Sequence, residues 1–322
     1  MVREAVRRLL VVACCLAPVA LTAPAAGEGS GEAPAEEVWR FDDPEIVESS
    51  GLVVTGEHVV TVNDSGDSGR VFVVDRDTGR TVGRTTWDEG PVDVEALAPA
   101  GEDHVWVADI GDNRRVRDRV EVLRVPVGEG KRHVVPERYE LAHPDGPADA
   151  EALLAHPRSG RLLLVTKDVF GGRVLAAPRR LSGERVNRLR EVGTTLGVAT
   201  GGSFLPDGRH LVIRNYGRAM LHRWPGLESL GAMVLPDQEQ GEAIAVAPGG
   251  EVFLSTEGLR TPLLRVSWTP DLQDAMAQQP DPPEPPPAPT AEALEPEVWP
   301  WLLGSALGVL VLVVLLRSLR PR

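Results

Sequence analysis

Between about Val38 and Trp268 the chain alternates short apolar runs with polar turns, and this pattern recurs in five successive units. Each unit opens with a head of small or acidic residues, passes through a tight turn, and continues into an apolar run that stops at a polar residue. Short runs bounded by Gly, Pro, Asn and Asp are typical of β-strands. The heads read VESSGLVV, DVEALAPA, DAEALLAH, ATGGSFLP and QGEAIAVA, and they start at Val47, Asp93, Asp149, Ala199 and Gln240.

The units repeat roughly every 40–56 residues, and each has room for four strands. This period is typical of β-propeller blades. A β-sandwich is the competing all-β fold, but it would not repeat its loops in step. We therefore expect an all-β propeller of five four-stranded blades, with a sixth, degenerate blade as the alternative. The N-terminal segment EVWRFD (37–42) would supply the outer strand of the last blade, and weak helical periodicity predicts one short helix near Leu181–Leu189.

Both ends of the chain carry segments typical of membrane targeting. Residues 1–26 place three arginines before an apolar run and a small-residue cleavage motif, which is the layout of a secretory signal peptide. Residues 299–316 are uncharged and, as a helix, long enough to span a thin bilayer, with the following arginines on the cytoplasmic side. The expected plan is a signal peptide (1–26), a linker (27–37), a propeller (38–269), a Pro- and acid-rich stalk (270–298), a transmembrane helix (299–316) and a basic tail (317–322).

Composition narrows the choice of partners. The net charge of −13 argues against nucleic acid, because phosphate binding needs a basic surface. The only cysteines, Cys14 and Cys15, lie in the signal segment, so the mature domain has neither a disulfide nor a cysteine-bound metal. The sequence contains no serine-elbow, zinc-protease, P-loop or dinucleotide-binding motif. We expect a monomer held in the cell membrane, with its propeller outside the cytoplasm.

The repeated acidic residues are the strongest candidates for chemistry. In an antiparallel blade, the head of the first strand and the polar end of the second strand emerge on the same face, near the central channel. Carboxylates that converge there repel one another, so something must offset their charge. The heads offer Glu48, Glu95, Glu151 and Glu242, and the strand ends offer Asp64, Asp109, Asp112, Lys167, Arg214, Tyr216 and Glu257.

Two interpretations of these residues remain open. In the first, a hard cation such as Ca²⁺, which takes six to eight oxygen ligands, is bound by Glu48, Glu95, Asp109, Asp112, Glu151 and Glu242. A small anionic ligand would then be held by Lys167, Arg214, Tyr216, Asp64 and Glu257. In the second, the basic side chains neutralise their acidic neighbours, and the glutamates accept loop hydrogen bonds that tie neighbouring blades together.

Two further motifs favour ordinary structure. The stretch NDSGDSG (63–69) could hold calcium, but Asx and Gly are also the residues of a plain turn. His58, His104 and His210 occupy equivalent positions in three units, which places them on the face opposite the glutamates and apart from one another. A shared zinc site is therefore not expected.

The strings ESSGL…VNDSGD, DVEAL…VADIGDN and DAEAL…VTK resemble secreted bacterial propeller proteins of the phytase-like, esterase-like group. Relatives in that group include calcium-dependent phytases, in which acidic residues on one propeller face hold calcium and phosphate. The resemblance implies metal-ligand roles for Glu95, Asp109, Asp112, Glu151 and Glu242, and anion-binding roles for Lys167 and Arg214. The Asn-Asn-x-Asp element typical of those enzymes is absent from this sequence.

From the sequence we predict a membrane-anchored, extracytoplasmic propeller that binds a small anionic ligand or a surface protein through an acidic face, with Ca²⁺ as cofactor. The alternative prediction is a calcium-dependent phosphoesterase of the phytase-like kind. The two differ in whether the protein hydrolyses a generic phosphate ester when calcium is supplied.

Overall fold

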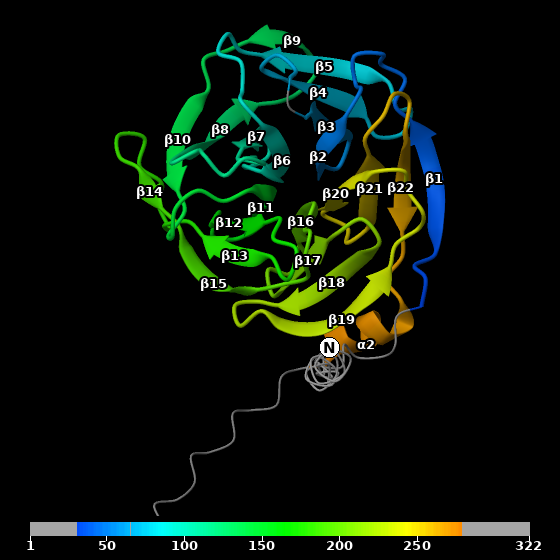
Figure 1. The fold of residues 1–322 in the computed structure, drawn as a ribbon. Coiled ribbons are helices and arrows are strands. Elements are labelled where there is room, and N and C mark those ends of the chain that lie inside the picture. The colour runs from blue at the N-terminus through cyan, green and yellow to red at the C-terminus, as the bar shows by residue number, and fades with distance from the viewer. Residues whose placement is uncertain (1–30, 65, 279–322) are drawn as a thin grey trace, which may run out of the picture. The chain divides into compact units, whose positions relative to one another are not determined.

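The structure is a computed structural model that describes residues 31–64 and 66–278. Within these residues, 22 strands fall into five sheets that stand around a common axis (Figure 1). The predicted five-bladed, all-β propeller is confirmed, and no sixth sheet occurs in this part of the chain. The predicted signal peptide, transmembrane helix and basic tail lie outside the described residues.

Each blade is an antiparallel sheet whose first strand lies innermost. Blade 1 contains β2 (Ser49–Val54), β3 (His58–Asn63), β4 (Arg70–Asp75) and β5 (Thr81–Thr86). Blade 2 contains β6 (Val94–Pro99), β7 (His104–Asp109), β8 (Val120–Pro126) and β10 (Glu137–Ala142). Blade 3 contains β11 (Ala150–Ala155), β12 (Leu162–Thr166), β13 (Arg173–Ala176) and β15 (Arg190–Thr194). Blade 4 contains β16 (Gly201–Phe204), β17 (His210–Arg214), β18 (Arg218–Arg223) and β19 (Glu228–Val234), and blade 5 contains β20 (Gly241–Val246), β21 (Val252–Thr256) and β22 (Pro262–Val266).

The ring is closed by the N-terminal strand β1 (Ala35–Arg40), which pairs antiparallel with β22 as the outer strand of blade 5. Phe41 follows this strand and is fully buried in the core between blades 5 and 1. The role predicted for the segment EVWRFD is thus confirmed. Because the first and last parts of the propeller share one sheet, the ring cannot open without breaking backbone hydrogen bonds.

Two short strands extend the blades beyond the expected four. β9 (Gly130–His133) runs parallel to β5, and β14 (Asn187–Arg188) runs parallel to β10, so each covers the outer edge of the preceding blade. The helix predicted over 181–189 is wrong, because this segment forms a loop that leads into β14. The Asn187 side chain accepts a hydrogen bond from Ser182 N and donates to Glu140 O, and these bonds hold the loop against blade 2.

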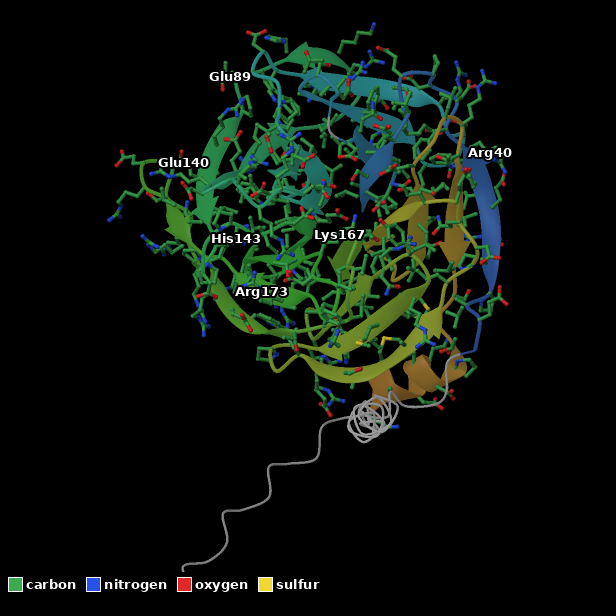
Figure 2. The ribbon with its side chains drawn as sticks, viewed as in Figure 1. Arg40, Glu89, Glu140, His143, Lys167 and Arg173 are labelled. Carbon is green, nitrogen blue, oxygen red and sulfur yellow. The ribbon has the colours of Figure 1, made fainter. Side chains whose placement is uncertain are left out.

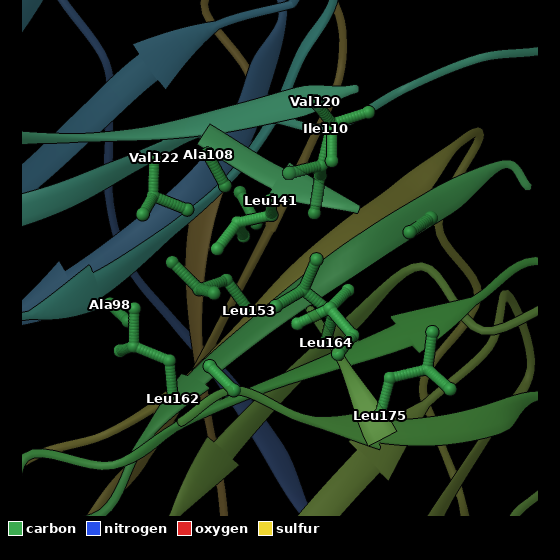
Figure 3. Packing of buried hydrophobic residues seen from close by; sticks show 14 of the residues in the cluster. Ala98, Ala108, Ile110, Val120, Val122, Leu141, Leu153, Leu162, Leu164 and Leu175 are labelled. Carbon is green, nitrogen blue, oxygen red and sulfur yellow. The ribbon is translucent and has the colours of Figure 1, made fainter. Parts of the chain in front are cut away.

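Five apolar cores lie between neighbouring blades, one at each junction of the ring. Between blades 2 and 3, for example, Ile110 and Leu141 pack with Leu153 and Leu164 (Figure 3). Each inner strand carries apolar residues on both faces, since each face meets a different neighbour. The propeller is therefore stabilised by contacts between sheets, and the inner strands are placed rigidly around the channel.

Helix α2 (Pro270–Ala277) follows the last blade and packs against β19, with Leu272 buried. These residues begin the segment that the sequence assigned to the stalk, and the compact unit ends at Gln278. Within the described ranges, no helix is long and apolar enough to cross a membrane. Residues 31–278 contain every strand of the five sheets and all five cores, so they form a complete folding unit.

Candidate functional site

The start of each inner strand pairs with the end of the second strand at one end of the channel. The pairs in blades 1 to 5 are Ser49–Asn63, Val94–Asp109, Ala150–Thr166, Gly201–Arg214 and Gly241–Thr256. Hydrogen bonds between blades join these ends, as from Ser50 Oγ to Glu95 O at 2.9 Å. We call this end the acidic mouth and define it by Glu48, Asp64, Asp93, Glu95, Glu151, Glu242 and Glu257.

A β-bulge places the repeated glutamates. In blades 2 and 3 the strand register shifts at Glu95 and at Glu151, and in blade 5 it shifts between Gly241 and Ile244, where Glu242 lies. A bulge adds one unpaired residue and re-aims its side chain. Blade 4, whose head has no acidic residue, pairs β16 with β17 without a shift.

The bulge also corrects the sequence alignment of the heads. In blade 1 the bulged residue is Ser50, and Glu48 lies two positions before it. Glu48 is therefore equivalent to Asp93 and Asp149 rather than to Glu95. Sequence comparison without register information had aligned the glutamates by residue type alone.

The polar residue that ends the second strand clamps the head beside it. In blade 1, Asn63 Oδ1 accepts hydrogen bonds from Val47 N (3.1 Å) and Glu48 N (3.3 Å). In blade 2, the Asp109 carboxylate accepts from Val92 N (2.7 Å) and Asp93 N (3.0 Å). The abrupt polar stop of the repeat is thus explained by backbone amides that need an acceptor.

Asp109 and Asp112, both predicted as metal ligands, hold the loop between β7 and β8. Asp109 also forms an ion pair with Arg117 at 2.8 Å, and its side chain is almost fully buried. Asp112 accepts a hydrogen bond from Arg117 N (2.7 Å), and its own N–H donates to Asp149 Oδ1 (2.9 Å). These contacts position the residues around them and favour a supporting role.

Three carboxylates from blades 1 and 2 converge at the acidic mouth. Asp64, Asp93 and Glu95 each offer an oxygen, and these oxygens lie within 4.8 Å of one another. Asp93 directly precedes β6 and Glu95 is the bulged residue of that strand, so the bulge decides how the two carboxylates lie. Neither side chain forms an ion pair with any other described residue. A Cβ on Gly111 would lie 2.5 Å from oxygens of both Asp93 and Glu95, so a larger residue there would displace these carboxylates.

Burial and mutual repulsion make Asp93 and Glu95 reluctant to ionise. Desolvation is the main cause that raises the pKa of Glu95 far above its ordinary value, and the charges of Glu151 and Asp64 raise it further. The pKa of Asp93 is also raised, first by desolvation and then by the charge of Asp64. In the folded protein these carboxyls therefore need a proton or a cation to offset their charge.

Blade 3 repeats the Asp-x-Glu motif, but its glutamate has a basic partner. Glu151 Oε1 accepts a hydrogen bond from Lys167 Nζ at 2.5 Å, whereas Glu151 Oε2 is buried without a hydrogen-bond partner among the described residues. Lys167 Nζ also lies 5.6 Å from the centre of the Tyr216 ring. Burial raises the pKa of Glu151 despite the lysine, and the pKa of Lys167 is raised by its bond to Glu151, against the opposing effect of burial.

Glu242 and Glu257 complete the acidic mouth on the side of blade 5. Burial raises the pKa of Glu242 to about 7, and the charge of Glu257 adds to this effect. Glu242 Oε1 accepts a hydrogen bond from Gln240 Nε2 at 3.3 Å. Glu257 pairs by its backbone with Glu48 across the junction of blades 5 and 1. The mouth thus continues around the channel from blade 5 to blade 3.

Arg214, predicted as an anion binder, is fully buried and has its donors engaged inside the protein. Its guanidinium donates to the carbonyl oxygens of Asn215, Tyr216 and Ala243, and to Gln238 Oε1. This arrangement ties the inner end of blade 4 to blade 5. Of the predicted basic residues, Lys167 therefore remains the one that is open to the mouth, with its side chain 22% exposed.

His143, which sequence reasoning missed, lies farther from the axis than Lys167 and near Arg173 (Figure 2). It is 5% exposed, and neither ring nitrogen has a hydrogen-bond partner among the described residues. Burial lowers its pKa, and the positive charge of Arg173 lowers it further. Both effects favour the neutral form of this histidine.

Asp93 is the main residue of the candidate site that sequence reasoning left out. The signal was present, because Asp-x-Glu occurs at the heads of both blade 2 and blade 3. In both blades the aspartate directly precedes the inner strand and the glutamate is its bulged residue. Attention to the repeated glutamate alone obscured the aspartate that precedes it.

Raising the pH should destabilise the protein in the presence of a chelator. A carboxyl whose pKa is higher in the folded than in the unfolded state contributes its full stability below the unfolded pKa and loses it as the pH rises through the folded pKa. For Glu242 this window runs from about 4.5 to about 7, and Glu95 extends it upward. The melting temperature of the wild type, relative to that of Glu95→Gln, should therefore fall between pH 5 and pH 8. A difference that stays constant with pH would contradict the raised pKa of Glu95.

Comparison with known proteins gives no family. No protein-family model matches the sequence, and no curated protein matches it. The chain is similar in structure to glutaminyl cyclase from Myxococcus xanthus, with 12% identity, a TM-score of 0.47, and coverage of 74% of this chain and 100% of that one. It is also similar to a luciferin-regenerating enzyme (10% identity, TM-score 0.45, 74% and 96% covered) and to a gluconolactonase from Xanthomonas campestris (13%, 0.43, 74% and 91%). The propeller fold is established by the sheet topology of the chain itself, and the resemblance to the phytase-like group stays a prediction.

Proposed function

We propose that the protein is a ligand-binding propeller whose acidic mouth holds a divalent hard cation, with Ca²⁺ the best match, between Asp64, Asp93 and Glu95. The observation that carries this proposal is the approach of three carboxylate oxygens to within 4.8 Å of one another. Two oxygens that each lie about 2.4 Å from one ion can be at most about 4.8 Å apart, so the three groups fit a shared cation. Carboxylate oxygen is also the ligand that Ca²⁺ prefers.

The ligand proposed for this site is a small anion that meets both the cation and Lys167. Lys167 projects from blade 3 at the mouth, beside the half-exposed Tyr216 of blade 4. Its ammonium has three donors, and one is used by Glu151. A phosphate or carboxylate group would use the others, while a bound cation offsets the surrounding carboxylates.

The proposal includes membrane placement, which rests on sequence alone. Residues 1–26 and 299–316 supply the signal peptide and the transmembrane helix of the prediction, and both segments lie outside the described residues. In this plan the propeller faces the exterior, where free calcium is plentiful enough for a site of moderate affinity.

A calcium-dependent phosphoesterase is the second candidate function. The supporting observation is Glu151, whose Oε2 is buried without a partner and whose pKa is raised by burial. A protonated carboxyl beside a cation is suited to give a proton to a leaving group. If this function holds, p-nitrophenyl phosphate should be hydrolysed only when calcium is present, and Glu151→Gln should lower kcat by about 100-fold or more.

Calorimetric titration of residues 27–278 tests the binding proposal directly. Calcium should bind with one-to-one stoichiometry, and inorganic phosphate should bind only after calcium. Lys167→Met should weaken phosphate binding about tenfold or more and leave calcium binding in place, because one charged hydrogen bond is lost. Lys131→Met removes the chain's other lysine, which is exposed on β9, and serves as the matched control. Phosphate binding that ignores both the chelator and Lys167→Met would contradict the proposal.

A further inference from the structure

The end of the channel opposite the acidic mouth opens into a cavity of about 810 Å³. The far halves of the inner strands of all five blades line it, together with the turns that follow them. Its volume lies in the range of small-molecule sites, which enclose about 300–1,000 Å³. Representative lining residues are Leu52, Leu97, Leu153, Phe204 and Ala245.

The lining of this cavity is apolar within and acidic at its rim. Leu52, Leu97 and Leu153 are nearly fully buried in the inner strands. The exposed Glu102 lies on the turn between β6 and β7, and His104 Nδ1 contacts the exposed Asp103 at 2.6 Å. An apolar wall with a few polar groups at one edge is the usual composition of a ligand pocket.

Blade 4 departs from the repeat at this cavity. In each blade, one residue of the inner strand pairs with the residue that lies two positions before the end of the second strand. This inner-strand residue is Ser203 in blade 4, whereas the other blades have Leu52, Leu97, Leu153 and Ile244. Ser203 and Gly202 both line the cavity. A fifth branched side chain here would bury more apolar surface, and leaving the space open forfeits that stabilisation. The change is local to the cavity wall, which points to a role for the open space.

We propose that this cavity is a second binding site, for a small molecule with an apolar body and an uncharged or positively charged polar end. The apolar body, such as an aromatic ring or a short acyl chain, lies against the inner-strand leucines and reaches the space beside Ser203. The polar end faces the rim, where the Glu102 carboxylate favours a positive charge and disfavours an anion. The site is separate from the acidic mouth and does not depend on a bound cation.

Fluorescence with the neutral probe N-phenyl-1-naphthylamine tests this site on residues 27–278. Trp106 lines the cavity and is half-buried, so its emission should be quenched by energy transfer as the probe binds. We expect saturable one-to-one binding that is unchanged by calcium or chelator, which distinguishes it from the site at the acidic mouth. Dodecylamine should displace the probe at lower concentration than laurate, because the two differ in the charge of the polar end.

Two substitutions at one position separate volume from hydrogen bonding. Ser203→Leu places in blade 4 the residue found in blades 1, 2 and 3 and should weaken probe binding at least tenfold. Ser203→Ala removes the hydroxyl, which accepts from Val246 N at 3.2 Å, but keeps the space, and should bind the probe as the wild type does. Pro99→Trp, at the exposed last position of β6, gives a second block that leaves the buried residues of the inner strands unchanged, and Arg209→Trp, outside the cavity, is its control.

Non-saturable binding of the probe to the wild type would overturn the proposed site. So would a probe affinity in both Ser203→Leu and Pro99→Trp that equals that of the wild type. Displacement by laurate as effective as that by dodecylamine would overturn the proposed charge of the ligand. A melting curve recorded for each variant identifies any loss of folding. If Ser203→Leu does not fold, the affinity of Pro99→Trp for the probe decides the result.

Discussion

Calcium at a hundredfold excess over its Kd should raise the melting temperature of residues 27–278 by about 5–10 °C. A ligand that binds only the folded state stabilises it by RT ln(1 + [L]/Kd), which is about 2.7 kcal/mol at this excess. For a domain of this size, each kcal/mol shifts the melting temperature by about 2–4 °C. The shift should be reversed by a chelator, and differential scanning calorimetry at constant pH measures it.

Asp93→Asn and Glu95→Gln should each abolish this response while keeping the shape of the site. In the absence of calcium, both variants should melt at a higher temperature than the wild type, because repulsion and the desolvation of a charge are relieved. Asp118→Asn, which neutralises an exposed carboxylate on the loop between β7 and β8, should respond to calcium as the wild type does. A wild-type melting curve indifferent to millimolar calcium and to chelator would leave the blade-tying interpretation of the acidic residues.

Arg214→Met should destabilise the protein by about 3–5 kcal/mol and lower its melting temperature by about 10 °C. The substitution keeps an unbranched side chain as far as the position of Nε but removes donors to three backbone carbonyls and to Gln238 Oε1, all near the junction of blades 4 and 5. Buried acceptors that lose their donors bear a desolvation cost. Chemical denaturation monitored by far-ultraviolet circular dichroism measures the change.

The control for this prediction is Arg218→Met, at an exposed position at the start of β18, where little change in stability is expected. If Arg214 has a structural role, the folded variant should still gain stability from calcium. It should also bind phosphate with nearly unchanged affinity. An Arg214→Met protein that is as stable as the wild type but no longer binds phosphate would return Arg214 to the ligand-binding role predicted from sequence.

The propeller could be predicted because its blades repeat. The sequence repeats five heads, five turns and five apolar runs in the same order, and few other all-β folds have this pattern. In a fold built from similar units, the repeat period of the sequence indicates the architecture. The closing strand could also be predicted, since EVWRFD combines strand-forming aromatic and β-branched residues with charged ones and is placed where the ring needs one more strand. The structure of residues 181–189 could not be predicted from the weak helical periodicity there. The segment instead forms a loop and β14, which covers the outer edge of blade 2.

The sequence predicted that acidic residues gather at one end of the channel, but it did not predict which of them meet. Glu95 and Asp64 were identified, and Asp93 was not, although the same Asp-x-Glu spacing recurs at the heads of blades 2 and 3. Asp109 and Arg214 were identified by charge, yet their hydrogen bonds show that they hold the loops. The residue type shows that a side chain can carry a charge. Its hydrogen-bond and ion-pair partners are known only from the assembled ring.

The sequence by itself determined the fold class, the number of blades, the closure by the N-terminal strand and the gathering of acidic residues at one mouth of the channel. These features follow from local periodicity, which acts within each repeat. Only the tertiary structure decided which carboxylates meet, because Asp64 comes from blade 1 and Asp93 and Glu95 from blade 2. The tertiary structure also fixed the bulge that turns Glu95 and Glu151 out of the ladder, since a bulge exists only in the register between two strands.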